Sequence, residues 1–186
     1  MTQNTKRFTR CFWALDKALA YARHYPAINW NTSYSEYLGD LSPWYYDNVG
    51  PDFMQCREHI AGLLLQETSL MEIVKLIGSD VLPDDQKLII EIARVIRVGF
   101  LQQNFFHDQD TYVSLEKQLK MMRVILHLYE KSQVLVAKQV PMSRVLRTGL
   151  FDKLVKMKYD IPNDHLELFD DYTAEIDQKI GELMRP

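Results

Sequence analysis

The chain is poor in cysteine, glycine and proline, with two, seven and seven of them among 186 residues. Cys11 and Cys56 make no disulfide framework and match no metal motif, so we expect both to be reduced in a cytosolic environment. The glycines stand singly, and none opens the glycine-rich loop that cradles phosphates in P-loop proteins. A self-sufficient nucleotide hydrolase is therefore not expected.

Signals for membrane insertion, nucleic-acid binding and catalysis are also missing. No run approaches the ~20 apolar residues that span a bilayer, and residues 1–7 lack the apolar core of a signal peptide. The net charge of −3 argues against non-specific nucleic-acid binding, and the basic stretch 144–158 is interpreted as a solvated helix face. The run 107–110 is interpreted as a solvated loop, and no serine or cysteine has a nucleophile context. We expect no metal site and no catalytic residue.

Apolar residues recur at spacings of three and four, which predicts amphipathic helices, whereas strand-like alternation is almost absent. Residues 24–50 are rich in aromatic and turn residues, and we expect an ordered loop segment with little helix there. The predicted fold is all-α, an antiparallel helical bundle over residues 51–186 that follows an irregular N-terminal segment. Helices are expected over 8–23, over 51–77 up to a cap at Gly78, from Pro83, after the N-cap Ser114, near 141–158 and from about Asn163.

Two aromatic segments are candidates for binding a flat ligand. Tyr25, held by Pro26, is either part of a turn packed on the bundle or one exposed wall for a planar group. Phe105 is either the apolar end of a helix or the opposite wall, with Gln103 and Asn104 as amide partners for a base edge. The residues alone leave both alternatives open.

The third candidate is an acidic turn between two predicted helices. It is either an ordinary turn whose acids match the dipole of the next helix, or an exposed contact at the tip of a helical hairpin. Its candidate partner-contact residues are Asp80, Val81, Leu82, Pro83, Asp84 and Asp85.

Taken in order, these segments resemble the C-terminal part of the catalytic A subunit of V-type and archaeal A-type ATPases. The resemblance covers essentially the whole chain, and the matching blocks are residues 12–16, 18–20, 23–30, 32–35, 100–104 and 110–112. More distantly, residues 78–88 lie where the F-type β subunit carries an acidic lever loop against the rotor, although Pro83 and Gln86 depart from that pattern. Tyr25 stands where this family usually has phenylalanine.

The resemblance implies a parent enzyme that couples ATP hydrolysis or synthesis to proton or sodium transport. This chain would be a piece of it, without the phosphate loop, the magnesium-binding acid and the general base. Residues 1–50 would be the trailing edge of the nucleotide-binding domain, with a hinge over 30–50, and residues 51–186 the C-terminal helical domain.

The resemblance also implies a ligand and partners. Tyr25 and Phe105 would sandwich the adenine of ATP or ADP, with magnesium bound only in the intact subunit. The turn at 80–85 would meet the central stalk, and the B subunit would be a neighbour. The head would lie on the cytoplasmic side, peripheral to the membrane. The rival interpretation is a stand-alone helical interaction module; the non-catalytic B subunit is disfavoured by the block 100–104.

Overall fold

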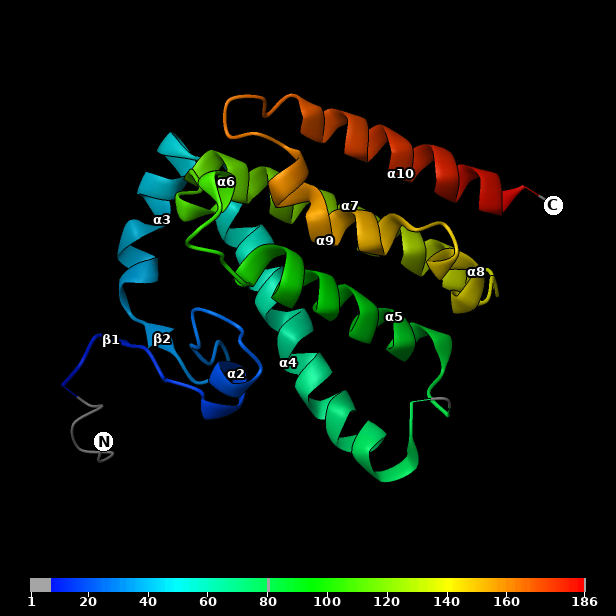
Figure 1. Ribbon diagram of the computed structural model, residues 1–186, viewed down its shortest axis with the longest axis horizontal. Coiled ribbons are helices and arrows are strands. Elements are labelled where there is room, and N and C mark those ends of the chain that lie inside the picture. Colours follow the sequence, from blue (N-terminus) through cyan, green and yellow to red (C-terminus); the bar gives the residue numbers. More distant parts are fainter. Residues whose placement is uncertain (1–7, 80, 186) are drawn as a thin grey trace.

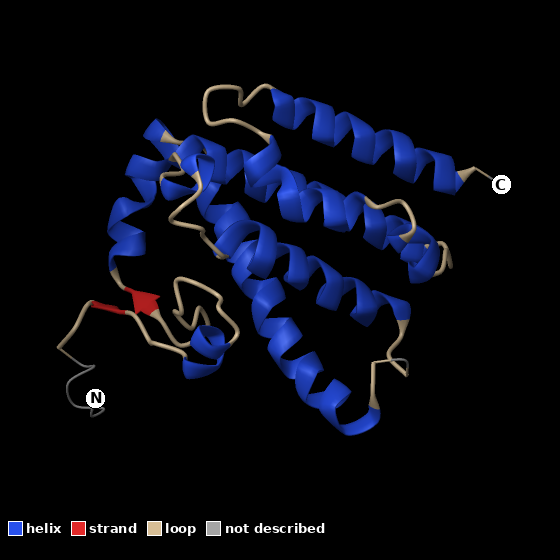
Figure 2. Cartoon of the chain, in the orientation of Figure 1, coloured by secondary structure: helices blue, strands red, loops and turns tan. Residues whose placement is uncertain are grey.

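The computed structural model describes residues 8–79 and 81–185 and shows a bundle of helices joined to a short strand pair (Figure 1). The N-terminal part contains β1 (Cys11–Phe12), α2 (Lys17–Tyr21), β2 (Tyr34–Ser35) and α3 (Tyr37–Asn48). The bundle contains α4 (Phe53–Ile77), α5 (Asp84–Arg94), η1 (Val95–Leu101), α6 (Asp108–Thr111), α7 (Leu115–Ala137), α8 (Met142–Leu146), α9 (Leu150–Asp160) and α10 (Leu168–Met184). Figure 2 shows how helices dominate, which confirms the predicted all-α fold.

The helix α7 lies at the centre of the core, in contact with α4, α5, η1, α9 and α10. Its apolar residues recur at helical spacing, so that Ile125 and Leu128 are fully buried. On α5 and η1, Leu88, Ile92 and Ile96 lie four residues apart and are buried in the same way. Burial of these stripes provides the main driving force for the bundle.

Local signals in the sequence correctly place the end of α4 and the starts of α5 and α7. Gly78 ends α4 with φ of 85°, a left-handed conformation that glycine adopts without strain. Pro83 precedes α5, and Asp84 lies in the first turn of that helix. The Ser114 side chain accepts a hydrogen bond from the Lys117 amide and caps α7.

The expected helix over 8–23 is wrong except for α2. Asp16 caps α2 by accepting hydrogen bonds from two amides, and Leu15 instead pairs with Ile28 in an isolated antiparallel bridge. Cys11 and Phe12 pair with β2. The residues before α2 that fit a helical pattern are therefore used in pairing with residues farther along the chain.

The expectation of little helix over 24–50 is also wrong, because α3 occupies the second half of that segment and keeps Pro43 inside it. The helix is anchored to α4 by stacking of Tyr45 on Phe53, with ring centroids 4.6 Å apart. The last helix begins later than predicted, at Leu168 instead of near Asn163.

The helix that begins with α5 does not stay α-helical, because its last seven residues, η1, form a π-helix. Such segments are uncommon and often occur at functional sites. None of the helices in the ranges 8–79 and 81–185 has the length and apolar character needed to cross a bilayer.

Candidate functional site

The two aromatic segments meet through their backbones. The Gln103 amide donates a 2.7 Å hydrogen bond to the Tyr25 carbonyl, and the Gln102 side chain donates a weaker one, 3.4 Å, to the Arg23 carbonyl. The N-terminal segment and the loop after η1 therefore lie side by side.

The aromatic side chains of these segments point to solvent. The Tyr25 side chain is 55% exposed and Phe105 is 75% exposed, so neither ring is part of the apolar core. Phe106 is also exposed, and its ring lies edge-on to that of Phe105 with centroids 5.6 Å apart. The assignment of the two rings as adenine contacts stays a prediction.

The amide residues of the loop have different environments. Gln103 is exposed, and its backbone amide is used in the bond to Tyr25. Asn104 accepts a hydrogen bond from the Phe106 amide through its side-chain oxygen, which shapes the turn locally. Both side chains lie on the same short loop as Phe105.

A buried ion pair lies behind this loop. Lys158 of α9 and Asp110 of α6 have their Nζ and Oδ2 atoms 2.8 Å apart, and each side chain is 1% exposed. Lys158 also donates to the Gln102 carbonyl, and Asp110 accepts a 2.5 Å hydrogen bond from the Asn104 amide and a 3.3 Å one from the Tyr159 hydroxyl. Burial lowers the pKa of Lys158, while Asp110 acts in the opposite direction.

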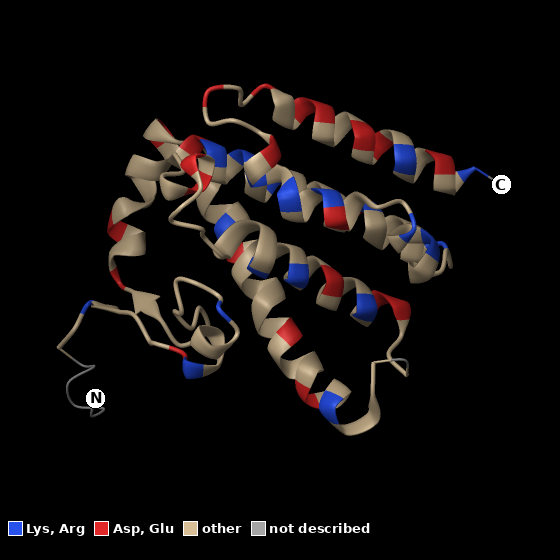
Figure 3. Cartoon of the chain, viewed as in Figure 1, with Lys and Arg blue, Asp and Glu red and all other residues tan. Residues whose placement is uncertain are grey.

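This pair corrects two interpretations of the sequence. The stretch 144–158 is not simply a solvated face, because Lys158 is buried, and the run 107–110 is not simply a solvated loop, because Asp110 is buried. Figure 3 shows basic residues along α9 and acidic residues along the neighbouring α10, and Lys153 forms an ion pair with Glu175 across them. No local motif in the sequence marks the Lys158–Asp110 pair.

A second buried lysine, Lys117, donates a hydrogen bond to the main chain of Lys158. Lys117 of α7 is fully buried and donates to the carbonyls of Lys158 and Ile161, at 2.9 and 2.7 Å, and to the Asn163 side chain. Burial lowers the pKa of Lys117, an effect that nearby Asp110 opposes. These bonds fix the end of α9, from which Lys158 reaches the loop.

The segment next to Tyr25 is anchored by His24 and Trp30. His24 is buried with its ring 5.7 Å from the Trp30 ring, edge to face. Burial lowers the pKa of His24, and the charges of Arg97 and Lys158 act in the same direction. Arg97 of η1 is itself held by Glu67 of α4 at 2.8 Å.

Only part of the acidic turn is accessible. Asp80 lies outside the described residues. Val81 is 68% exposed, Pro83 and Asp85 are also exposed, and Leu82 is buried at 4%. Asp84 accepts a 2.9 Å hydrogen bond from the Met142 amide and lies 3.7 Å from Lys87. A contact surface at this turn would therefore consist mainly of Val81, Pro83 and Asp85.

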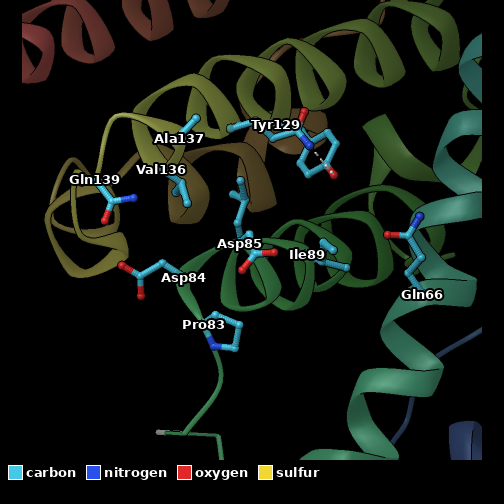
Figure 4. Close-up of a pocket in the computed structure, with 11 residues that line it drawn as sticks. Gln66, Pro83, Asp84, Asp85, Ile89, Tyr129, Val136, Ala137 and Gln139 are labelled. Atoms are coloured by element: carbon cyan, nitrogen blue, oxygen red, sulfur yellow. Dashed lines mark hydrogen bonds between the residues drawn. The ribbon is translucent and has the colours of Figure 1, made fainter.

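Beside the turn lies an open cavity of about 770 Å³, shown in Figure 4. Asp85 and Ile89 of α5 lie on one side of it, and Tyr129 and Val136 of α7 on the other. The Tyr129 hydroxyl accepts a 2.8 Å hydrogen bond from Gln133. The cavity thus has an acidic mouth and a partly apolar wall.

The described residues contain no cluster of three or more His, Cys, Asp or Glu side chains placed to hold a metal ion.

Comparison with known proteins places the chain in a family. The sequence pattern of the C-terminal domain of V and A type ATP synthase matches residues 42–146. The chain is 51% identical over 183 residues to the V-type ATP synthase alpha chain of Halothermothrix orenii, covering 98% of this chain and 31% of that protein. It is 52% identical over 166 residues to the V-type ATP synthase alpha chain 2 of Clostridium tetani, covering 89% and 28%.

An archaeal relative, the A subunit of the A-type ATP synthase of Methanopyrus kandleri, is 44% identical over 185 residues, covering 99% of this chain and 31% of that protein. The chain thus spans less than a third of the length of these relatives. The resemblance seen at residues 23–30 and 100–104 is confirmed, and the chain belongs to the family of V- and A-type ATP synthase C-terminal domains.

Proposed function

We propose that this chain is the C-terminal part of a catalytic subunit of a rotary V/A-type ATPase. In the intact subunit it would close over the adenine of ATP or ADP and transmit that closure to the central stalk. The complete machine would couple ATP hydrolysis or synthesis to proton or sodium transport, with the B subunit and the stalk subunits as partners. The hydrogen bond between Gln103 and Tyr25 carries the proposal, because it joins the two segments that present the exposed rings.

The loop chemistry suits adenine. Tyr25 and Phe105 offer aromatic faces to solvent, and exposed Gln103 and Asn104 offer amide donors and acceptors for a base edge. Stacking contributes roughly 1–3 kcal/mol per base, whereas association costs at least about 4 kcal/mol in lost freedom. This chain alone should therefore bind nucleotide weakly, and tight binding needs the phosphate contacts of the intact subunit.

One helical rod connects the proposed adenine loop to the acidic turn. The segments α5 and η1 run without interruption from Asp84 to Leu101, a length of roughly 25 Å at the usual helical rise. The loop begins at Gln102 and the turn ends at Pro83, so the two ends of one rod carry the two proposed contacts. A rigid rod of this kind can convert closure at the nucleotide into a displacement at the stalk, as in hinge motions of other proteins.

The test replaces both aromatic walls in the full-length subunit within the assembled ATPase. Tyr25→Ala with Phe105→Ala should raise the KM for ATP at least about tenfold, since two stacking contacts of ~1–3 kcal/mol each are lost. Tyr112→Ala is the matched control, because Tyr112 is 77% exposed but belongs to neither wall. An unchanged KM in the double variant would remove the adenine assignment.

A further inference from the structure

We propose that the buried Lys158–Asp110 ion pair is a positioning device for the loop 102–106, and that it sets nucleotide affinity without touching the nucleotide. The inference rests on the adenine site proposed above. The pair is buried, whereas the rings of Tyr25 and Phe105 are exposed, and it joins α9 and α6 to the main chain of the loop.

Three consecutive residues of the loop are held by their main chains. The Gln102 carbonyl accepts from Lys158, and the Asn104 amide donates to Asp110 at 2.5 Å. Between them, the Gln103 amide donates to the Tyr25 carbonyl at 2.7 Å. Gln102 and Asn104 are thus bound to the buried ion pair, and Gln103, between them, is bound to the segment that carries the Tyr25 ring.

The energetics of buried charges favour a geometric role over a stabilising one. Removing two charges from water is costly, so a buried ion pair is often no more stabilising than apolar residues of similar volume. The Asp110 Oδ1 atom is buried and has no hydrogen-bond partner among the described residues, which adds to that cost. What apolar residues cannot supply is directional hydrogen bonds to the Gln102 carbonyl and the Asn104 amide.

The loop needs such a support because it has no regular secondary structure of its own. Residues 102–104 follow the end of η1, so their main-chain groups depend on partners elsewhere in the fold, such as the Arg97 and Tyr25 carbonyls and the buried pair. Lys117 provides a second layer by holding the Lys158 carbonyl at 2.9 Å. A small displacement of a ligand-binding group can change binding or rate by large factors.

The test uses the full-length subunit in the assembled ATPase, with Lys158→Met and Asp110→Leu combined so that no buried charge is left alone. The expected result is a KM for ATP about tenfold higher, with kcat changed less than twofold. Hydrogen exchange at the Gln103 and Asn104 amides should become at least tenfold faster, because their support is lost. The matched control combines Lys153→Met and Glu175→Leu, which removes the ion pair between α9 and α10 and should leave KM and loop exchange unchanged.

The outcomes separate the two proposals. Faster loop exchange with unchanged KM would uphold the support of the loop but overturn its role in affinity; if Tyr25→Ala with Phe105→Ala also left KM unchanged, the adenine site itself would be wrong. Unchanged exchange in the double variant would overturn the positioning role directly. If the double variant fails to assemble, Lys158→Met with Asp110→Asn leaves no buried charge and removes the donor to the Gln102 carbonyl; a KM and loop exchange identical to the parent would then refute the proposal.

Discussion

The contact between η1 and α9 depends on the absence of a side chain at Gly99. A Cβ atom placed there would lie 2.9 Å from the Val155 Cα, 3.1 Å from the Leu154 carbonyl oxygen and 3.3 Å from the Val155 carbonyl oxygen. All three are backbone atoms of α9, so no change of rotamer can relieve the overlap. Because carbon atoms pack best at about 3.5–4.0 Å, Gly99→Ala should separate the two helices by roughly 0.6–1 Å.

The expected destabilisation follows from two opposing effects. Adding a methyl group to a tightly packed contact costs about 1–3 kcal/mol. Alanine is favoured over glycine in a helix by about 0.8–1.0 kcal/mol, an advantage that opposes the cost. We expect a net loss of about 0–2 kcal/mol for Gly99→Ala, which corresponds to a decrease in Tm of up to roughly 8 °C for a chain of this size.

Thermal unfolding followed by far-UV circular dichroism measures this change, and two other glycines serve as matched controls. Gly62 of α4 and Gly181 of α10 are also helical, but a Cβ at either position meets no atom within 4 Å. Gly62→Ala and Gly181→Ala should therefore raise stability by up to about 1 kcal/mol. If Gly99→Ala proved as stable as these two variants, the close approach of η1 to α9 would be refuted.

Two further predictions use single side chains. In the assembled ATPase with Cys11 replaced by serine, Val81→Cys labelled with a maleimide that carries a benzophenone should photo-cross-link to a central stalk protein, because the benzophenone inserts into C–H bonds of its neighbour. Val98→Cys on η1 should not, and no stalk adduct from Val81 would contradict the proposed contact of the acidic turn with the stalk. In the isolated chain, burial raises the pKa of the Cys56 thiol to about 11, and the negative charge of nearby Asp52 acts in the same direction. The thiolate fraction of Cys56 at pH 8 is therefore roughly 100-fold below that of an ordinary thiol. A thiol reagent such as DTNB should modify exposed Cys11 rapidly and Cys56 only on unfolding; two fast thiols would exclude the buried environment.

The long helices could be predicted from the sequence because their signals are local. Gly78 and Pro83 bracket the turn between α4 and α5, and Ser114 caps α7 from its own first turn. Each signal acts on amides or carbonyls within four residues, so the neighbouring sequence contains the whole cause. The rest of the molecule changes such boundaries little.

The N-terminal segment could not be predicted in the same way, because its structure comes from pairing across the chain. Leu15 occupies a position that suits a helical stripe, yet it pairs with Ile28, and Phe12 pairs with Tyr34. In α3 the apolar pattern is weak, and the stacking of Tyr45 on Phe53 of the next helix supports the segment. Tertiary contacts therefore override local preference in both places.

In the candidate site, too, some features could be predicted from the sequence and others come only from the tertiary structure. Aromatic and amide residues make the loop at 102–106 and Tyr25 candidates from the sequence, and the resemblance to a family predicts that the two face the same ligand. The buried pair behind the loop gives no such signal, since Lys158 belongs to a basic stretch and Asp110 to an acidic one. Such stretches are solvated in most proteins, and only the fold shows that one charged member of each is buried.

The helix α9 links the packing of the bundle to the proposed site. It meets η1 at Gly99, forms an ion pair from Asp152 to Arg94 at 2.9 Å, and supplies Lys158 to the loop. A substitution that moves α9 away from η1 should therefore also move the Lys158 ammonium away from the Gln102 carbonyl. On this reasoning Gly99→Ala should raise the KM for ATP in the assembled enzyme, whereas Gly181→Ala should alter stability and leave KM unchanged. Equal KM values for the two variants would show that the packing at Gly99 does not control the geometry of the loop.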